Sequence, residues 1–135
     1  MMNKFVDRLL EAAKQCSELK DFRLVRAFGG SEIPYPIDKP LACFGEGMAD
    51  KMDFLLGYDE GLFSGENMVV SVLTDESHGG AYCEECAKKL CTVILELDRS
   101  RMIMAVGVEK YMYDKVNFAY KVIMRFSLRE QMTEV

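Results

Sequence analysis

The sequence is short of the residues on which most protein chemistry depends. His78 is the single histidine among 135 residues, and tryptophan is absent. A mechanism or a metal centre that needs two imidazoles is therefore excluded. With 3 prolines and 10 glycines, the chain also lacks the composition of a linker or a low-complexity protein.

Long apolar runs are missing as well. No stretch approaches the roughly 18 consecutive apolar residues of a membrane span. Asp7 and Arg8 interrupt the first apolar pattern, where a signal peptide would have an unbroken apolar stretch. We therefore expect a soluble protein that is neither exported nor bound to a membrane.

Positive charge is scarce. The chain has 17 Lys and Arg residues against 22 Asp and Glu residues, a net charge of −5. This balance argues against a general attraction to nucleic acid, so we expect no sequence-specific nucleic-acid binding. The acidity is concentrated in the middle: residues 41–100 have 4 basic and 12 acidic side chains, a net charge of −8.

The cysteines do not form a disulfide framework. There are five of them, an odd number scattered over the chain, which favours a reducing compartment. They are Cys16, Cys43, Cys83, Cys86 and Cys91.

What is present is the composition of one globular domain, which we expect to span 1–135. Half of the residues are hydrophobic, and a chain of this length buries roughly two thirds of the surface that it exposes when unfolded. It can therefore build a core without disulfides or a structural metal ion.

Hydrophobic periodicity predicts two helices and five strands. Apolar residues recur every three or four positions in the two helices and alternate in the last two strands. In the strand 116–128 every even position is apolar, which predicts one buried face. Gly29-Gly30 predicts a hairpin-like reversal after the first strand. The predicted elements are helix 3–20, strands 22–28, 41–46 and 68–74, helix 82–97, and strands 102–112 and 116–128. This order, α-β-β-β-α-β-β, predicts an α+β domain in which two helices pack on one face of a mostly antiparallel sheet.

The sharpest short motif is Cys83-Glu84-Glu85-Cys86, at the start of the second helix. A helix N-terminus lowers a thiol pKa, so a small thioredoxin-like thiol-disulfide oxidoreductase using Cys83 and Cys86 is one hypothesis. The two intervening glutamates oppose a thiolate, however, and the last proline of the chain is Pro40. The alternative is that the cysteines of this helix are small residues facing the core.

Other candidate sites have weaker patterns. His78, Cys83 and Cys86, with Cys91 or Cys43, offer only one closely spaced ligand pair, whereas structural zinc sites usually have two. Gly79-Gly80 before a helix resembles half of a phosphate loop, but the following glutamates would repel an anion. We therefore expect no catalytic residues, no bound metal and no cofactor.

The segment 47–66 combines apolar residues with four glycines and regular structure is not predicted for it. Such a segment either covers the core or contacts a partner, and a binding module with its ligand here is a third hypothesis. Its candidate interface residues are Met48, Met52, Phe54, Leu55, Leu56, Leu62 and Phe63, and its acidic residues are Asp50, Asp53, Asp59, Glu60 and Glu66.

The layout resembles the tail-terminator or tail-completion proteins of long-tailed bacteriophages and of prophage-derived tails. The resemblance covers the whole chain through its length and order of elements. It is carried by the N-terminal helix, the extended segment Ile33–Pro40 leading into strand 41–46, the strand 68–74 with its following loop and helix, and the paired long strands around Tyr113-Asp114.

This resemblance implies a structural protein without catalytic residues. It would form a homo-oligomeric ring of six subunits that ends the growth of the tail tube and joins it to the head connector, in the host cytoplasm during assembly and then in the virion tail. The acidic residues would line the lumen, where they would keep DNA from adhering. The apolar residues of 47–66 would contact a neighbouring subunit or the tube, and exposed residues of the long strands would pair or pack across subunits. A different component of the phage neck or tail with a similar α+β core stays an alternative to the terminator.

Overall fold

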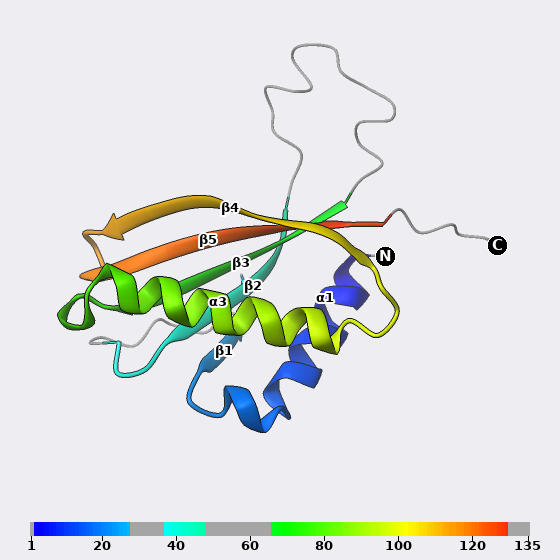
Figure 1. The fold of residues 1–135 in the computed structure, drawn as a ribbon, viewed down its shortest axis with the longest axis horizontal. Helices are drawn as coiled ribbons and strands as arrows, with labels where there is room; N and C mark the ends of the chain where they lie inside the picture. The colour runs from blue at the N-terminus through cyan, green and yellow to red at the C-terminus, as the bar shows by residue number, and fades with distance from the viewer. Residues whose placement is uncertain (1, 28–36, 48–65, 130–135) are drawn as a thin grey trace, which may run out of the picture.

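The computed structural model describes residues 2–27, 37–47 and 66–129, which form a sheet with helices on one side (Figure 1). The order α-β-β-β-α-β-β and the α+β class predicted from the sequence are confirmed. The helices are α1 (Met2–Lys14) and α3 (Gly80–Leu97), with short 3-10 turns η1 (Ser17–Leu19) and η3 (Glu76–His78); the strands are β1 (Arg23–Arg26), β2 (Leu41–Gly47), β3 (Glu66–Asp75), β4 (Ile103–Asp114) and β5 (Ala119–Leu128).

The sheet has the strand order β1-β2-β3-β5-β4. Every neighbouring pair is antiparallel except β1 and β2, which run parallel from Arg23 opposite Leu41 to Arg26 opposite Phe44. The hairpin-like reversal predicted after β1 is therefore wrong. A parallel pair needs a connection that returns the chain to the starting end of the sheet, and the chain between Arg26 and Leu41 is too long for a tight hairpin.

Both helices pack on the same face of the sheet and enclose the main core. Helix α1 lies over β1, β2 and β3, and α3 lies over β3 and β5. The even positions of β5 from Val122 to Leu128 are buried, as their alternation predicts. They meet buried side chains from both helices, including Val6, Leu9, Cys83, Leu90 and Ile94.

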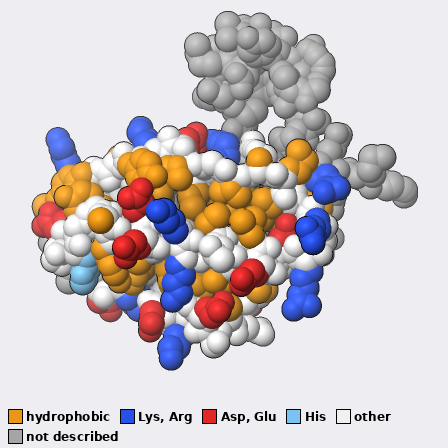
Figure 2. Space-filling model, in the orientation of Figure 1, with side chains coloured by type: hydrophobic (Ala, Val, Ile, Leu, Met, Phe, Trp, Pro, Cys, Tyr) orange, Lys and Arg blue, Asp and Glu red, His pale blue; other side chains and the backbone are white. Residues whose placement is uncertain are grey.

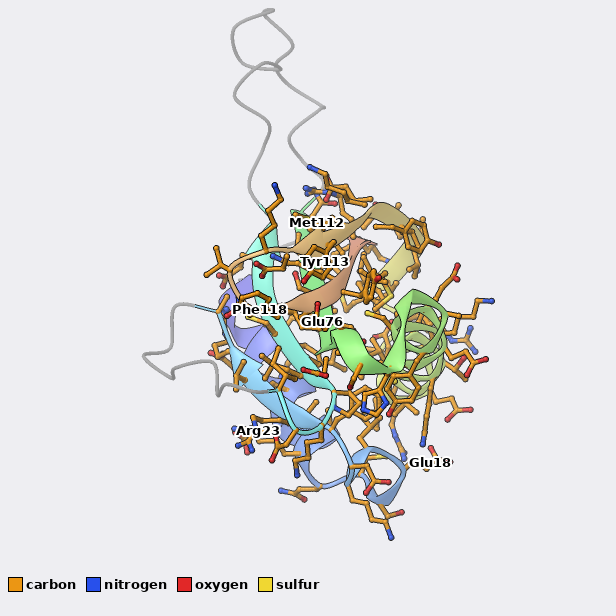
Figure 3. The ribbon with its side chains drawn as sticks, turned by 90° about the vertical axis from the view of Figure 1, so that its left-hand side faces the viewer. Glu18, Arg23, Glu76, Met112, Tyr113 and Phe118 are labelled. Atoms are coloured by element: carbon orange, nitrogen blue, oxygen red, sulfur yellow. The ribbon has the colours of Figure 1, made fainter. Side chains whose placement is uncertain are left out.

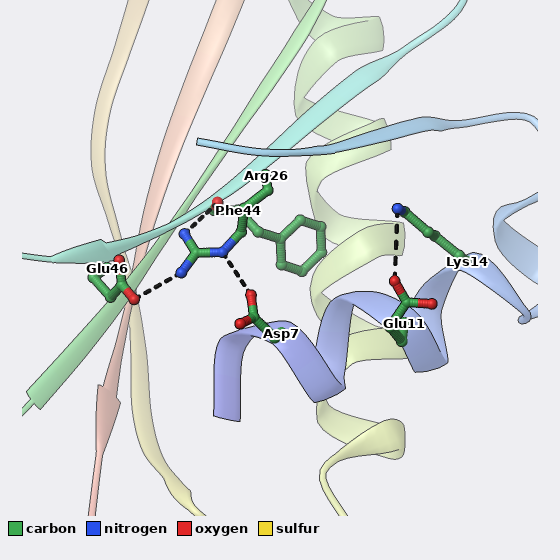
Figure 4. Close-up of polar contacts among 6 residues, drawn as sticks. All are labelled: Asp7, Glu11, Lys14, Arg26, Phe44 and Glu46. Atoms are coloured by element: carbon green, nitrogen blue, oxygen red, sulfur yellow. Dashed lines mark hydrogen bonds and ion pairs between the residues drawn. The ribbon is translucent and has the colours of Figure 1, made fainter. Parts of the chain in front are cut away.

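Arg26 ties the N-terminal helix to the parallel edge of the sheet (Figure 4). Its guanidinium donates to Asp7 of α1 at 2.9 Å, to Glu46 of β2 at 2.7 Å and to the Phe44 carbonyl at 3.4 Å. The hydrogen bond to Asp7, followed by that to Glu46, raises the pKa of Arg26. One half-buried cation thus fixes three elements to one another.

The turn of the C-terminal hairpin lies further along the chain than the sequence pattern predicts, because β4 continues to Asp114, beyond the predicted end at 112. Strand β5 begins at Ala119, and Val116 and Phe118, which the alternation places in the strand, lie in the turn before it. Phe118 has a positive φ of 51°. The reason is local: the Asp114 carboxylate binds the backbone N–H groups of Val116 and Asn117, and this turn replaces the first three residues of the predicted strand.

Candidate assembly interface

Exposed apolar side chains are concentrated on β4 and the turn after it. Of the nine large hydrophobic residues that are exposed in the described parts of the chain, seven belong to this hairpin. Figure 2 shows hydrophobic side chains gathered along β4 and α3, and Figure 3 shows Met112, Tyr113 and Phe118 at the end of the hairpin. We call these seven residues the apolar edge: Met104, Val108, Tyr111, Met112, Tyr113, Val116 and Phe118.

The position of β4 in the sheet explains this exposure. Strand β4 is the last in the order, and within the described residues it pairs only with β5. Neither α1 nor α3 covers it as they cover the other strands. At 12 residues it is much longer than β1, the strand of 4 residues at the other edge. A long edge strand with exposed apolar side chains and unpaired backbone groups is a surface onto which another chain can pair.

The hairpin is held in place at its start by Asp98. This residue ends α3, and its side chain is buried, with the residue only 9% exposed. Its carboxylate accepts hydrogen bonds from the backbone N–H groups of Met102 at 3.0 Å and Ile103 at 2.8 Å. The end of the helix thereby sets where β4 begins.

Tyrosines hold the other end of β4 against the rest of the protein. The Tyr113 hydroxyl donates to Glu76 at 2.5 Å, and its ring meets that of Tyr120 edge-on with centroids 5.3 Å apart (Figure 3). Tyr111 faces a hollow of about 360 Å³ between β4 and the start of α3, which Glu84 also lines. Desolvation and a hydrogen bond with Glu84 raise the pKa of Tyr111. The edge is therefore a fixed surface at this end.

Asp114 stabilises the turn between β4 and β5. Its carboxylate accepts hydrogen bonds from the backbone N–H groups of Val116 at 3.0 Å and Asn117 at 3.2 Å, and from the Asn117 amide at 2.8 Å. These bonds, above all that from the Asn117 side chain, lower the pKa of Asp114 because they favour the charged carboxylate.

Replacing Asp114 by alanine is expected to cost about 1 kcal/mol of stability at neutral pH, the usual value for a partly exposed hydrogen-bonded group. A carboxyl whose pKa is lowered by folding stabilises the protein above its unfolded pKa, and this contribution is lost as the pH falls through the folded-state pKa. The stability difference between the natural protein and Asp114→Ala should therefore shrink in acid. Urea denaturation followed by circular dichroism at several pH values measures it, and a difference that does not change with pH contradicts the prediction.

The interface residues predicted from the segment 47–66 fall outside the described residues. This holds for Met48, Met52, Phe54, Leu55, Leu56, Leu62 and Phe63, and for Asp50, Asp53, Asp59 and Glu60. Glu66 is the first residue of β3 and pairs with Leu128. The roles expected for these residues stay predictions, whereas the apolar edge comes from the strands that the resemblance implicates only in general.

The cysteines of α3 pack on the core, as one of the sequence hypotheses predicts. Cys83 is fully buried, and its Sγ donates to the carbonyls of Val72 and Tyr120 at 3.4 Å. Cys86 and Cys91 are half-buried against the same core. Burial raises the pKa of all three thiols, with the charge of Glu85 adding to the effect on Cys86. This direction is opposite to the one that a thiolate nucleophile requires.

His78 is exposed, and its ring lies against Tyr82 with centroids 4.7 Å apart. It lines a hollow of about 300 Å³ together with Asp21, Asp38 and Asp75. Across residues 2–27, 37–47 and 66–129, no three His, Cys, Asp or Glu side chains are grouped so that they could hold a metal ion. The described helices also include none that is long and apolar enough to cross a membrane.

The fold and the apolar edge thus define an α+β domain with one long, open sheet edge. The sequence matches no model of a known protein family, and no curated protein shows significant similarity to it.

Proposed function

We propose that this protein is a structural subunit of a bacteriophage tail, which assembles with copies of itself on the end of the tail tube that faces the head and so ends the growth of the tube. The observation that carries the assembly part is the apolar edge, because seven of the nine exposed large hydrophobic residues of the described chain lie on one hairpin. Concentrated exposure of this kind is typical of a surface that is covered by another protein. The tail part rests on the resemblance in length and order of elements to tail-terminator proteins.

The charge of the chain is compatible with this role. A net charge of −5, with −8 in residues 41–100, would keep DNA from adhering as it passes through a ring. The ring of six subunits, the tail-tube and head-connector partners, and the location in the host cytoplasm and then the virion tail belong to this proposal. It involves no catalytic residue and no cofactor.

The thiol-disulfide alternative has less physical support. Its nucleophile would be Cys83 or Cys86, and burial raises the pKa of both thiols. Cys83 also has no exposed surface from which to reach a substrate disulfide. An insulin-reduction assay tests this alternative directly: activity that is lost when Cys83 and Cys86 are both replaced by serine would favour it over the tail protein.

Deletion of the gene from the phage or prophage that carries it tests the proposed function. We expect tails of irregular length and heads without attached tails in electron micrographs, because nothing would stop growth of the tube or join it to the head. A plasmid copy of the gene should restore uniform tails. Normal virions from the deleted phage would contradict the proposal.

A plasmid copy with Val108→Lys distinguishes loss of the interface from loss of the protein. Val108 is exposed on β4, so the substitution should leave the fold intact while placing a charge on the apolar edge. We expect this copy to fail to restore uniform tails, whereas Lys88→Ala on the exposed side of α3 should restore them. Equal restoration of uniform tails by both variants would show that the function does not need the apolar edge.

A further inference from the structure

We propose that two copies of this protein pair through their β4 strands, antiparallel and about a two-fold axis between Glu109 and Lys110. The two sheets then form one continuous sheet, with the helices of both copies on the same side. The pairing goes beyond the proposed function, because it assigns the apolar edge to a two-fold contact, which uses the same surface twice and closes with two copies. A ring of six subunits would then consist of three such pairs joined through another surface.

A bulge in the middle of β4 determines which residues can face each other. The register with β5 shifts between Val108 and Lys110, so Glu109 has no residue opposite it. Such a bulge bends the strand and inserts one extra residue into the alternation of faces. Residues on either side of it that are three apart, such as Val108 and Tyr111, therefore lie on the same face.

The register with β5 confirms these faces. Val108 lies opposite Met124 and Tyr111 opposite Val122, and both β5 residues point into the core on the helix side. On the other face, Gly107 lies opposite Arg125.

Residues that face each other across an antiparallel pair must share a face. With the axis between Glu109 and Lys110, Val108 lies opposite Tyr111 of the second copy, both on the helix side. Gly107 lies opposite Met112 of the second copy, both on the other side, since Met112 pairs with Lys121 on that face. This register therefore places residues of the same face opposite each other on both sides of the sheet, along the centre of the strand.

The side chains in this register also complement each other. A Cβ built on Gly107 would have nothing within 4 Å, so there is open space beside the glycine for Met112 of the second copy. Val108 and Tyr111 are both exposed in the single chain, and a β-branched residue opposite an aromatic one is a favourable cross-strand pair. The pairing would cover apolar surface that the fold leaves open.

Charge favours this register over the two registers that are shifted by one residue. Glu109 of each copy lies opposite Lys110 of the other, and both residues are exposed. Glu109 already binds Arg125 of its own chain at 3.0 Å, which restrains its carboxylate on the face of the sheet opposite the helices. A shift of the register by one residue in either direction would place Glu109 opposite Glu109 or Lys110 opposite Lys110, and like charges in that position are unfavourable.

Charge-reversal variants test the pairing. In Glu109→Lys and in Lys110→Glu, each homodimer has like charges opposite each other at two symmetric places. This repulsion should raise the dissociation constant of the dimer by about tenfold. A mixture of the two variants has opposite charges at both places, so a heterodimer should form at the affinity of the natural protein. Analytical ultracentrifugation measures the dissociation constants, and native mass spectrometry identifies the heterodimer by its mass.

Glu109→Gln is the matched control, because it removes the bond to Arg125 without placing like charges across the interface. It should dimerise more tightly than Glu109→Lys, and circular dichroism should show that all variants are folded. A natural protein that stays monomeric at high concentration, or a mixture in which no heterodimer forms, would overturn the pairing. Irregular tails on deletion of the gene would still support the proposed function in that case, so the two proposals can fail separately.

Discussion

Replacing Leu90 by alanine is expected to lower the free energy of unfolding by about 2–5 kcal/mol, the range for a leucine removed from a packed core. Leu90 is 0% exposed and lies on the side of α3 that faces the sheet. Its side chain belongs to the core cluster that joins α1, α3, β3 and β5. The substitution would therefore leave a cavity at the centre of the fold, since packed neighbours relax only partially.

Leu95→Ala on the same helix is the control. Leu95 is 45% exposed, so its truncation removes little buried surface, and alanine is the better helix former. Urea denaturation followed by circular dichroism should show a change of less than about 1 kcal/mol for this variant. Equal losses for the two leucines would mean that α3 does not pack on the sheet through Leu90.

Replacing Asp98 by alanine is expected to cost about 3 kcal/mol. The carboxylate binds the backbone N–H groups of Met102 and Ile103, and hydrogen bonds to a charged group contribute about 1.5–3 kcal/mol each when they are shielded from water. Without the carboxylate, both N–H groups lose their partner at the point where β4 begins. The start of the edge strand should then fray.

Two measurements check this prediction. Urea denaturation should show a large loss for Asp98→Ala and a loss of less than about 0.5 kcal/mol for Glu96→Ala, whose side chain is exposed on the same turn of α3. Amide hydrogen exchange should increase at Met102 and Ile103 in the Asp98 variant and stay unchanged in β5. Unchanged exchange at both positions would show that the carboxylate does not hold the strand.

The parts of the fold that the sequence predicts are those with a strong period. The alternation of β5 and the stripe of α3 each place the correct side chains in the core, because burial on one face is what creates these patterns. The parallel pairing of β1 and β2 could not be found in this way, since a strand of 4 residues has the same pattern whichever way its neighbour runs. The sequence pattern predicts strand where the turn after β4 lies, because Val116 and Phe118 continue the alternation of β5 by chance.

The exposure of the apolar edge could not be predicted from the sequence pattern either. An alternating strand predicts which of its faces is apolar, but its place in the sheet decides whether a helix covers that face. Strand β4 lies beyond both helices, so Val108 is exposed although it lies on the helix side. One signal was available: Tyr111, Met112 and Tyr113 are apolar on consecutive positions, which a strand with one solvated face does not require.

The two edges of the sheet differ, and this limits how the protein can aggregate. Growth of a fibre by edge-to-edge addition needs two edges that each accept another strand. Here β4 offers 12 residues, whereas β1 offers 4 and carries Arg23 and Arg26, which form ion pairs with Asp38 and with Asp7 and Glu46. Addition at β4 therefore ends after one step, and concentrated solutions of the protein should stay clear and bind no amyloid dye.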